Sequence, residues 1–488
     1  MWDKEDYIMV VQHNMQAANA NRMLNVTTSA QSKSTEKLSS GYRINRAADD
    51  AAGLTISEKM RKQIRGLDQA STNAQDGVSS VQTAEGALTE VHSMLQRMNE
   101  LATQAANGTN SKDSDRQAIQ DEIDQLTTEI DRVSETTKFN ETYLLKGDKG
   151  ATKNVYMNGH DAGLKGTLTD SAKSATFVMD TLSEGDKITI AGKEYKIGSS
   201  TTDATNLIDK ANKELTAAGA GSTKDVEIDG KKYTLTFKAG GNTIADAEGN
   251  AVADLNTLKG KVKEGSSVGY DGKTLTVMND KLGGGTDGKT ADGIDDDDSS
   301  IITAARAKDL IKAELTAANN IGTVDEKATV EDGVDADGKT TFEIHKGYAT
   351  VANTLSFNLH VGADADMTNK INVEIDSMDS ASLGIKGLSI MDDSGNAATY
   401  AVDAISDAIS KVSSQRSSLG AVQNRLEHTI NNLDNVVENT TTAESRIRDT
   451  DMASEMVNYS KNNILAQAGQ SMLAQANQQT QGVVSLLQ

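Results

Sequence analysis

Two apolar stripes that repeat every seven residues, one toward each end of the chain, constrain the fold most. The N-terminal stripe consists of Met60, Leu67, Ala74, Val81, Leu88, Leu95 and Ala102. The C-terminal stripe consists of Ile405, Val412, Leu419, Leu426, Leu433, Thr440 and Ile447. A stripe this narrow is typical of a helix that packs against another helix. The pattern predicts a mainly α fold in which both termini form long antiparallel coiled-coil helices and the middle of the chain loops out.

The composition agrees with thin helical seams and small β units. Only 36% of the 488 residues are hydrophobic and 3% are aromatic, too few for one large core. The chain has no proline, so the strongest helix breaker is missing. It has no cysteine, which excludes disulfides, thiolate metal sites and a cysteine nucleophile.

The acidic balance of the chain argues against two classes of partner. A net charge of −22 repels the phosphate backbone of nucleic acids. No segment has the length and apolarity of a membrane span, and the N-terminus lacks the pattern of a cleaved secretory signal. We therefore expect neither a nucleic acid nor a membrane as partner, and any secretion would use a route without a cleaved signal.

The first residues of the chain match nothing that follows. Heptad order begins near Val10, and Lys4-Glu5-Asp6 can be back-translated into a ribosome-binding sequence just upstream of Met9. Residues 1–8 are therefore interpreted as a misread leader, with Met9 as the true start. The alternative is a short disordered tail.

Two arms of similar composition are expected at the ends of the chain. The N-terminal arm, residues 9–50, carries a weak heptad of Val10, Ala17, Leu24, Gln31 and Leu38. The C-terminal arm, residues 451–488, is rich in Gln, Ala and Asn and follows a charged break. Each has too little apolar area to be stable alone, so each should need a partner.

Residues 51–145 predict a helical hairpin. The first helix runs from Gly53 to the stop signals at 107–110. Ser114 with Gln117 reads as a capping box that begins the second helix.

Residues 146–356 predict an outer α+β domain that is rich in hairpins. Related turns occur at 190–195, 228–233 and 270–275, and related helical stretches begin at Asn206 and Lys308, which together suggest a partial duplication. The low-complexity run 283–298 predicts a mobile loop. Further strands are expected at 342–344, 355–360 and 371–375, and residues 357–450 should hold the return strands and a helix over 401–445.

No set of residues predicts an enzyme, a cofactor site or a metal site. The six histidines are scattered without metal-ligand spacing. Asp335, Asp337 and Gly338 resemble part of a calcium-binding loop. The first and twelfth ligand positions of that loop would be Gly333 and Ile344, neither of which has a side-chain oxygen, so the match fails. Asp295–Asp298 is interpreted as a solvated acidic loop and Gly283–Gly285 as a linker.

The polar loop 39–50 has two readings. Arg43, Arg46, Asp49 and Asp50 lie between two helices that both need partners. The loop is either a solvated turn or a charged contact between subunits, and the residues alone favour neither.

Several long motifs resemble bacterial flagellins. They are Leu38–Asn45, Ala48–Leu54, Leu95–Ala102, Glu129–Ser134 with Phe139-Asn140, Leu419–Arg425, Ser445–Asp451, Ile464–Gly469 and Leu473–Asn477. They occur in the family's order and cover about 9–145 and 375–488, whereas no resemblance is identified for the middle. Thr480 departs from the family, in which proline is frequent near the C-terminal end.

The resemblance implies a self-assembling subunit of the flagellar filament. Such a subunit would be secreted by type III export with a chaperone, and it would be added at the tip under the cap protein, beyond the hook–filament junction proteins. The terminal arms would form the inner coiled coil. Arg448 and Asp449 join the loop residues as expected subunit contacts.

The resemblance also implies recognition by the host Toll-like receptor five. The family's receptor contact maps onto Arg97, Leu101 and Glu122. The alternative is that Arg97 and Glu122 are ordinary exposed helix charges.

Three other functions were weighed. A hook–filament junction protein shares the terminal helices but not the full set of motifs. A flagellin with a peptidase domain would need a His-Glu-x-x-His motif, which residues 146–356 lack. An adhesin would bind glycan or a host surface through the β domain.

Overall fold

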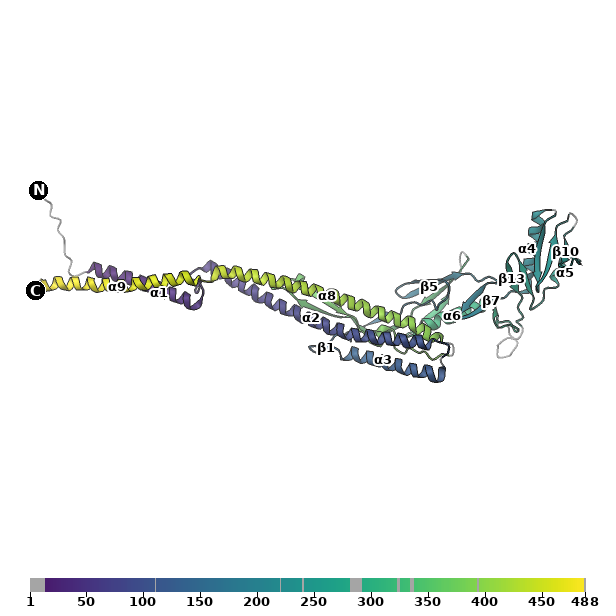
Figure 1. Cartoon of the computed structure of the whole chain (residues 1–488), viewed down its shortest axis with the longest axis horizontal. Helices are drawn as coiled ribbons and strands as arrows, with labels where there is room; N and C mark the ends of the chain where they lie inside the picture. Colours follow the sequence, from purple (N-terminus) through teal and green to yellow (C-terminus); the bar gives the residue numbers. More distant parts are fainter. Residues whose placement is uncertain are drawn as a thin grey trace. The chain divides into compact units, whose positions relative to one another are not determined.

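The computed structural model describes residues 14–109, 111–219, 221–238, 241–280, 292–322, 325–333, 338–392 and 395–486. It divides into two compact units. Unit 1 comprises the chain up to Val81, Phe357–Val373 and the chain from Gly420, and unit 2 comprises Gln82–Ser356 and Glu374–Leu419. The predicted fold class is confirmed, because long helices lie near both ends of the sequence and the inserted region is rich in strands (Figure 1).

The two arms form an antiparallel helix pair within unit 1. α1 (Met15–Ser40) lies beside α9 (Met452–Leu486), as Figure 1 shows. The Asn14 amide, at the start of α1, donates to Ala476 O at 3.1 Å near the end of α9. Gly41 ends α1 in the left-handed conformation with φ 77°, the usual helix C-cap.

Two further helices carry the predicted stripes and contribute residues to both units. These are α2 (Ala51–Ala105) and α8 (Asn396–Arg448). The stripe residues that the structure buries are Ala74, Val81, Leu88, Leu95, Ala102, Ile405, Val412, Leu419, Leu426 and Leu433. The heptad prediction is confirmed for them, and the remaining stripe residues, Met60, Leu67, Thr440 and Ile447, are only partly buried.

A two-stranded sheet lies against α2 and α8 in unit 1. Its strands are β18 (Leu355–His360) and β19 (Lys370–Ile375). Val361 and Ile371 pack with Ala74 and Leu426 in one apolar cluster. The helices and the sheet therefore share the small core of this unit.

The helical hairpin of unit 2 begins its second arm differently from the prediction. α3 (Gln117–Thr136) follows a π-helical turn, η1 (Lys112–Arg116), and has no side-chain cap. The Ser114 hydroxyl bonds to Ser111 and Asp115, so the predicted capping box is wrong. The π turn satisfies the first amides of the segment locally, which leaves no backbone donor for Ser114.

The strands of unit 2 form several small sheets. The six-stranded sheet has the order β11 (Ala251–Val252), β10 (Thr243–Asp246), β9 (Lys231–Thr236), β8 (Thr223–Ile228), β12 (Ser267–Tyr270), β13 (Lys273–Thr276). The four-stranded sheet is β15 (Thr329–Asp332), β16 (Lys339–His345), β5 (Ser174–Asp180), β4 (Thr167–Asp170), and the three-stranded sheet is β14 (Ile301–Ile302), β7 (Lys193–Ile197), β6 (Lys187–Ile190). Pairs form between β17 (Tyr348–Asn353) and β3 (Asp148–Tyr156) and between β1 (Lys138–Phe139) and β2 (Thr142–Tyr143).

Two helices build separate cores on these sheets. α4 (Thr201–Ala218) packs with α5 (Leu255–Lys259) on the six-stranded sheet, and α6 (Ala304–Ala318) packs on the other two sheets. These are the two related helices of the sequence. The three predicted hairpins are β6–β7, β8–β9 and β12–β13. Both central residues of each turn have positive φ, as a type I′ turn requires.

The acidic run before β14 is better ordered than predicted. Asp295 is only 5% exposed, and its carboxylate accepts from the backbone N–H groups of Asp297, Asp298 and Asn279. Residues 292–298 therefore form a hydrogen-bonded turn in which Asp295 is buried, whereas Asp296, Asp297 and Asp298 are exposed, as expected of a solvated acidic loop. Residues 281–291, which hold the glycine run, lie outside the described part of the chain.

Other predictions also fall outside the described residues. These are the leader 1–8 and the aspartates of the calcium-like loop, Asp335 and Asp337. Within the described ranges, no helix combines the length and apolarity that crossing a membrane requires. In the same ranges, no cluster of three His, Cys, Asp or Glu side chains could hold a metal ion.

Candidate assembly and recognition surfaces

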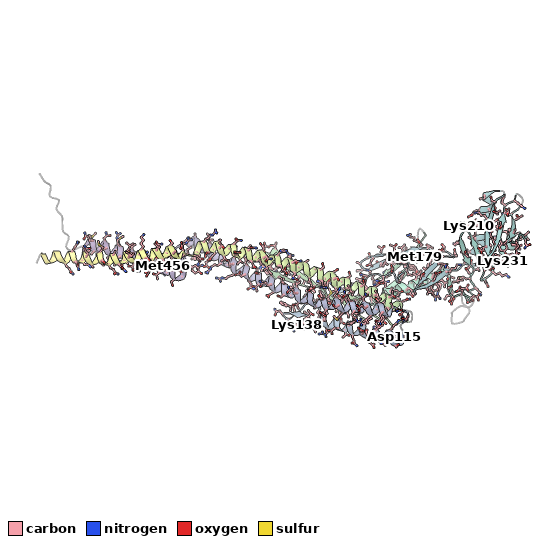
Figure 2. All side chains as sticks on the ribbon, viewed as in Figure 1. Asp115, Lys138, Met179, Lys210, Lys231 and Met456 are labelled. Atoms are coloured by element: carbon pink, nitrogen blue, oxygen red, sulfur yellow. The ribbon has the colours of Figure 1, made fainter. Side chains whose placement is uncertain are left out.

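The arm helices leave large apolar side chains in water. The set is Met15, Met23, Val26, Met452, Met456, Val457, Ile464, Leu465 and Met472, each between 47% and 74% exposed. Figure 2 labels Met456 on α9. By contrast, the residues that the pair buries are small, such as Ser34, Ala466 and Ala476. Contiguous exposed apolar surface of this kind marks an interaction site.

These side chains line two shallow hollows. Met456, Val457, Ile464 and Leu465 border a hollow of about 500 Å³ along α9. A second hollow of about 510 Å³ lies between α1 and α9, where Met23 and Met472 face each other across it. The pair therefore offers apolar side chains both on one helix and in the groove between two.

The loop that joins α1 to α2 is tied to the end of α8. The Arg43 guanidinium donates to Ile447 O at 2.5 Å, and Arg43 N donates to Arg448 O at 2.7 Å. Asp449 forms a β-bridge with Tyr42 and accepts from the Ser445 hydroxyl at 2.6 Å. Arg43, Arg448 and Asp449, predicted as subunit contacts, are thus brought together within one chain.

The other three predicted contact residues shape the loop itself. The Asp49 carboxylate accepts from Arg46 N and Asn45 N, and the bond from Arg46 lowers the pKa of Asp49. The Asp50 carboxylate accepts from Gly53 N at 2.8 Å and so caps α2. The Arg46 side chain pairs with Glu36 at 2.9 Å and remains 72% exposed. Two of the six predicted residues, Arg46 and Arg448, form ion pairs within the described part of the chain. The Arg46 side chain is the more exposed of the two and could therefore contact a neighbouring subunit.

Sequence reasoning missed the polar cluster beneath this loop. The Tyr42 ring lies between the Arg448 guanidinium, 4.8 Å away, and that of Arg61, 5.7 Å away. Glu444 is only 8% exposed and accepts from the Ser57 hydroxyl at 2.9 Å. A signal was present, because Glu444 continues the heptad of Ile430 and Val437, where an apolar residue is expected.

The residues predicted to contact a receptor converge on one face of α2 and α3. The Arg97 guanidinium pairs with Glu122 at 2.9 Å and with Glu100 at 3.2 Å, and the bond from Glu122 raises the pKa of Arg97. The Arg97 and Glu122 side chains are 49% and 44% exposed. Leu101 is only 2% exposed, so it lies beneath this surface and not on it.

Comparison with known proteins identifies related sequences at both ends and along the whole chain. Residues 11–150 match the bacterial flagellin N-terminal helical region, and residues 402–487 match the corresponding C-terminal region. A flagellin from Clostridium tyrobutyricum is 40% identical over 97% of this chain and 100% of its own length. A flagellin from Bacillus subtilis is 35% identical over 98% of this chain and 100% of its own length.

A solved structure is also similar to this chain. A FliC structure from Burkholderia pseudomallei is 19% identical, with coverage of 72% of this chain and 99% of that chain, and its TM-score is 0.26.

Proposed function

Since the chain belongs to the bacterial flagellin family and is a structural subunit of the flagellar filament, we propose that it polymerises through the apolar side chains exposed on α1 and α9. Burial of one such side chain contributes about 1.5–3 kcal/mol, so neighbouring copies could supply the core that the arms lack. The relatives are flagellins over nearly the full chain, which favours a filament subunit over a junction protein. The proposed role needs no catalytic group and no cofactor.

We propose that the charged loop contributes to contacts between subunits in two ways. Arg46 would reach a neighbouring copy directly, because most of its side chain is in water. Arg43, Asp49, Asp50, Arg448 and Asp449 would act by fixing the loop and the start of α9 in one geometry. Their bonds within the chain support this division.

Seeded polymerisation tests the role of the arms. Full-length monomer is added to short filament seeds, and growth is followed by negative-stain microscopy and sedimentation. Ile464→Asn should abolish or strongly slow growth, because Ile464 is 67% exposed on α9. Met367→Asn is the matched control, since Met367 is 74% exposed outside the arms. Equal growth of the wild type and the Ile464 variant would refute the proposal.

A truncation gives a second test of the same proposal. Removal of residues 451–488 deletes α9 and the partner of α1. We expect no filaments from this variant on any seed. Long filaments from it would show that the arms are not required.

We further propose that the chain is secreted and reaches the outside of the cell unfolded, through flagellar type III export. The exposed apolar side chains of α9 support a need for a chaperone before export, because free subunits would otherwise associate. At the tip, the cap would receive the subunit, and the filament would continue from the hook–filament junction proteins. The measurement is co-purification of the chaperone with wild-type chain and its loss with Ile464→Asn.

We also propose that Arg97 and Glu122 bind the Toll-like receptor five, with Leu101 supporting them from below. The ion pair and the exposure of both partners support this surface. Arg97→Ala should weaken binding of full-length monomer to the receptor ectodomain about tenfold or more, which corresponds to about 1.4 kcal/mol.

The chain offers a matched control for the receptor test. Arg132 forms an ion pair with Glu129 on α3 and is 60% exposed, yet it has no proposed role. Arg132→Ala should bind the receptor as the wild type does. If the Arg97 and Arg132 variants bind equally, the receptor proposal fails while the assembly proposal stands.

A further inference from the structure

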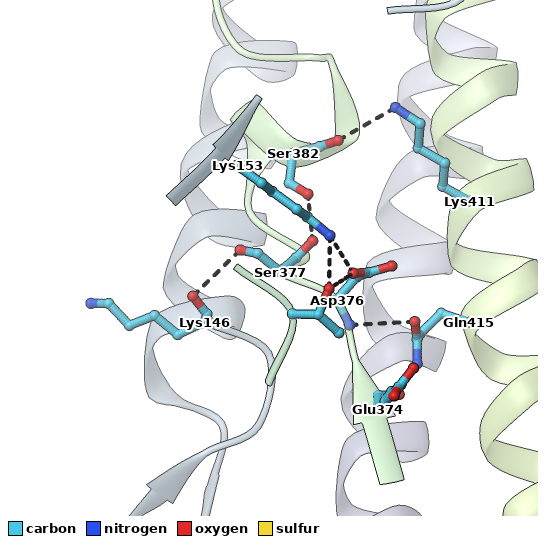
Figure 3. A network of polar contacts seen from close by, with 9 residues as sticks. Lys146, Lys153, Glu374, Asp376, Ser377, Ser382, Lys411 and Gln415 are labelled. Carbon is cyan, nitrogen blue, oxygen red and sulfur yellow. Dashed lines mark hydrogen bonds and ion pairs between the residues drawn. The ribbon is translucent and has the colours of Figure 1, made fainter. Parts of the chain in front are cut away.

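A cavity of about 440 Å³ lies in unit 2, beside the N-terminal half of α8. Figure 3 shows its polar side, with Lys411 and Gln415 of α8 facing Lys153 of β3 and the segment that contains Asp376 and α7 (Ser380–Leu383). Its size falls within the range of about 300–1,000 Å³ that small-molecule sites occupy. None of the assembly or receptor residues described above lines it.

The carboxylates of the cavity already have partners. One Asp376 oxygen accepts from the Lys153 ammonium at 2.6 Å and from the Thr354 hydroxyl at 2.6 Å, as Figure 3 shows in part. Asp407 faces His160, with 3.5 Å between the carboxylate oxygen and Nε2. Neither carboxylate forms an ion pair with Lys411 within the described ranges.

Lys411 is the lysine of the cavity that forms no ion pair among the described residues. Among described residues, its ammonium has one hydrogen-bond acceptor, Ser382 O, at a long 3.4 Å (Figure 3). Burial lowers the pKa of Lys411, Asp407 partly opposes this effect, and Lys346 adds to it. An anion placed against this ammonium would replace solvation that burial has removed.

Uncharged polar groups surround the ammonium. Ser410, Lys411 and Ser414 of α8 all line the cavity, and Ser410 and Ser414 share one face of the helix because they are four residues apart. Asn158 lines the opposite side. The side chains of Ser410, Ser414 and Asn158 have no hydrogen-bond partner in the described part of the chain. Val155 and Leu383 complete the lining with apolar surface, as sugar rings require for their C–H faces.

We propose that this cavity binds a carboxylate-bearing monosaccharide, a hexuronate, with its carboxylate on Lys411 and its hydroxyls on Ser410, Ser414 and Asn158. A lysine without an ion pair beside several hydroxyl and amide groups without hydrogen-bond partners matches the chemistry of an acidic sugar. It matches a neutral sugar or a simple carboxylate less well, because each would leave one half of the site unused. A filament with this site would bind acidic polysaccharides through their terminal residues.

The test measures binding of galacturonate to full-length monomer by ligand-observed NMR and calorimetry. A ligand of about 13 non-hydrogen atoms should bind with a Kd of about 1 mM at ordinary ligand efficiency. We expect galactose, which lacks the carboxylate, and acetate, which lacks the hydroxyls, each to bind at least about tenfold more weakly. Equal binding of galactose, or full competition by equimolar acetate or sulfate, would overturn the proposal.

Variants place the binding in this cavity. Lys411→Gln should weaken galacturonate binding about tenfold or more and leave galactose unchanged, and Ser410→Trp should block the cavity without touching the ammonium. Lys231→Gln is the control, because Lys231 is an exposed lysine on β9, labelled in Figure 2. Circular dichroism checks that each variant is folded. If Lys411→Gln does not fold, Ser410→Trp decides, and undiminished binding by it would refute the site.

Discussion

Gly77 and Gly86 both lie on α2, in opposite surroundings. A Cβ added to Gly77 would lie 2.2 Å from Leu359 Cδ1 and 3.3 Å from Leu426 Cδ1, whereas a Cβ at Gly86 meets no atom within 4 Å. Alanine stabilises an exposed helix position by about 1 kcal/mol relative to glycine. At Gly77 overpacking costs about 1–3 kcal/mol and opposes this gain. We therefore expect Gly86→Ala to raise the melting temperature and Gly77→Ala to lower it or leave it unchanged, by calorimetry. A higher melting temperature for both variants would mean that Leu359 of β18 moves away from the added methyl group without loss of stability.

Tyr400 gives a prediction about alkaline stability. Its hydroxyl donates to the Glu314 carboxylate at 2.5 Å, and burial, with this bond, raises the pKa of Tyr400 well above its usual range. Because the pKa is raised in the folded state, the Tyr400 hydroxyl contributes its full stabilisation of the fold below the unfolded pKa of about 10. This stabilisation is lost as the pH rises through the folded pKa.

The measurement for Tyr400 is urea unfolding of unit 2 between neutral pH and pH above 10. The free energy of unfolding of the wild type should fall at alkaline pH. Tyr400→Phe should have a lower free energy of unfolding at neutral pH, but this value should fall less as the pH is raised. Tyr459→Phe, which removes a hydroxyl with no described bond to a carboxylate, should follow the wild type. A parallel pH profile for Tyr400→Phe would contradict the assignment.

Some residue roles could be predicted from sequence and others could not. The stripes placed Leu88, Leu95 and Ile405 in the seams because heptad spacing reports burial directly. Arg116, 2% exposed, could not be placed, because its bonds to Ala105 O and Asp392 O join segments distant in sequence. The convergence of Arg97 and Glu122 came from a family resemblance, since they lie on separate helices. The cavity beside Lys411 has no local sequence signal.

At the scale of elements, the contacts of Arg448 with Tyr42, Arg43 and Glu58, here called the Arg448 clasp, should hold the loop 41–50 to the end of α8. The Arg448 guanidinium pairs with Glu58 at 2.7 Å and stacks on Tyr42. We expect Arg448→Ala to destabilise the clasp by about 2 kcal/mol, the sum of a charge-assisted bond and a cation–π contact. Hydrogen exchange should then speed up at Arg43 N and Thr450 N, which bond across the clasp.

The neighbouring arginine is the control for the clasp. The side chain of Arg446 is exposed on the last turn of α8, and only its backbone carbonyl takes part in the clasp. Arg446→Ala should leave exchange at Arg43 and Thr450 unchanged. Faster exchange in both variants would point to a general weakening of the end of α8.

Elements differed in how far sequence could predict them. Asp-Gly turns in two hairpins and an Ala-Gly turn in the first identified them, because type I′ turns need two central residues with positive φ. The pairing of β5 with β16 could not be predicted, since these strands lie far apart in the chain. The start of α3 was mispredicted because a π turn took the place of a side-chain cap. Local chemistry thus gave the elements, and long-range pairing required the structure.

At the scale of the molecule, the core around α4 forms a separable module within unit 2. All its buried residues lie between Ala204 and Val277. The chain enters and leaves this module side by side, because Ser199 bridges Val277, with Ser199 N donating to Thr276 O at 2.8 Å and Met278 N to Ser199 O at 3.0 Å. Because this bridge is parallel, a linker of about a dozen residues is needed to lead the chain from Ser199 back to Met278.

We expect a variant in which a flexible Gly/Ser linker of about twelve residues replaces residues 200–277 to fold and to polymerise on seeds. The arm helices, which carry the exposed apolar residues, contribute nothing to the α4 core, and the α6 core keeps all its buried residues. Seeded growth should proceed at the wild-type rate, measured by sedimentation, while circular dichroism shows the loss of β signal. A matched deletion of 301–332, which removes α6 and part of the second core, should unfold its surroundings and slow assembly. Loss of assembly in the first variant would mean that the α4 module itself takes part in subunit contacts.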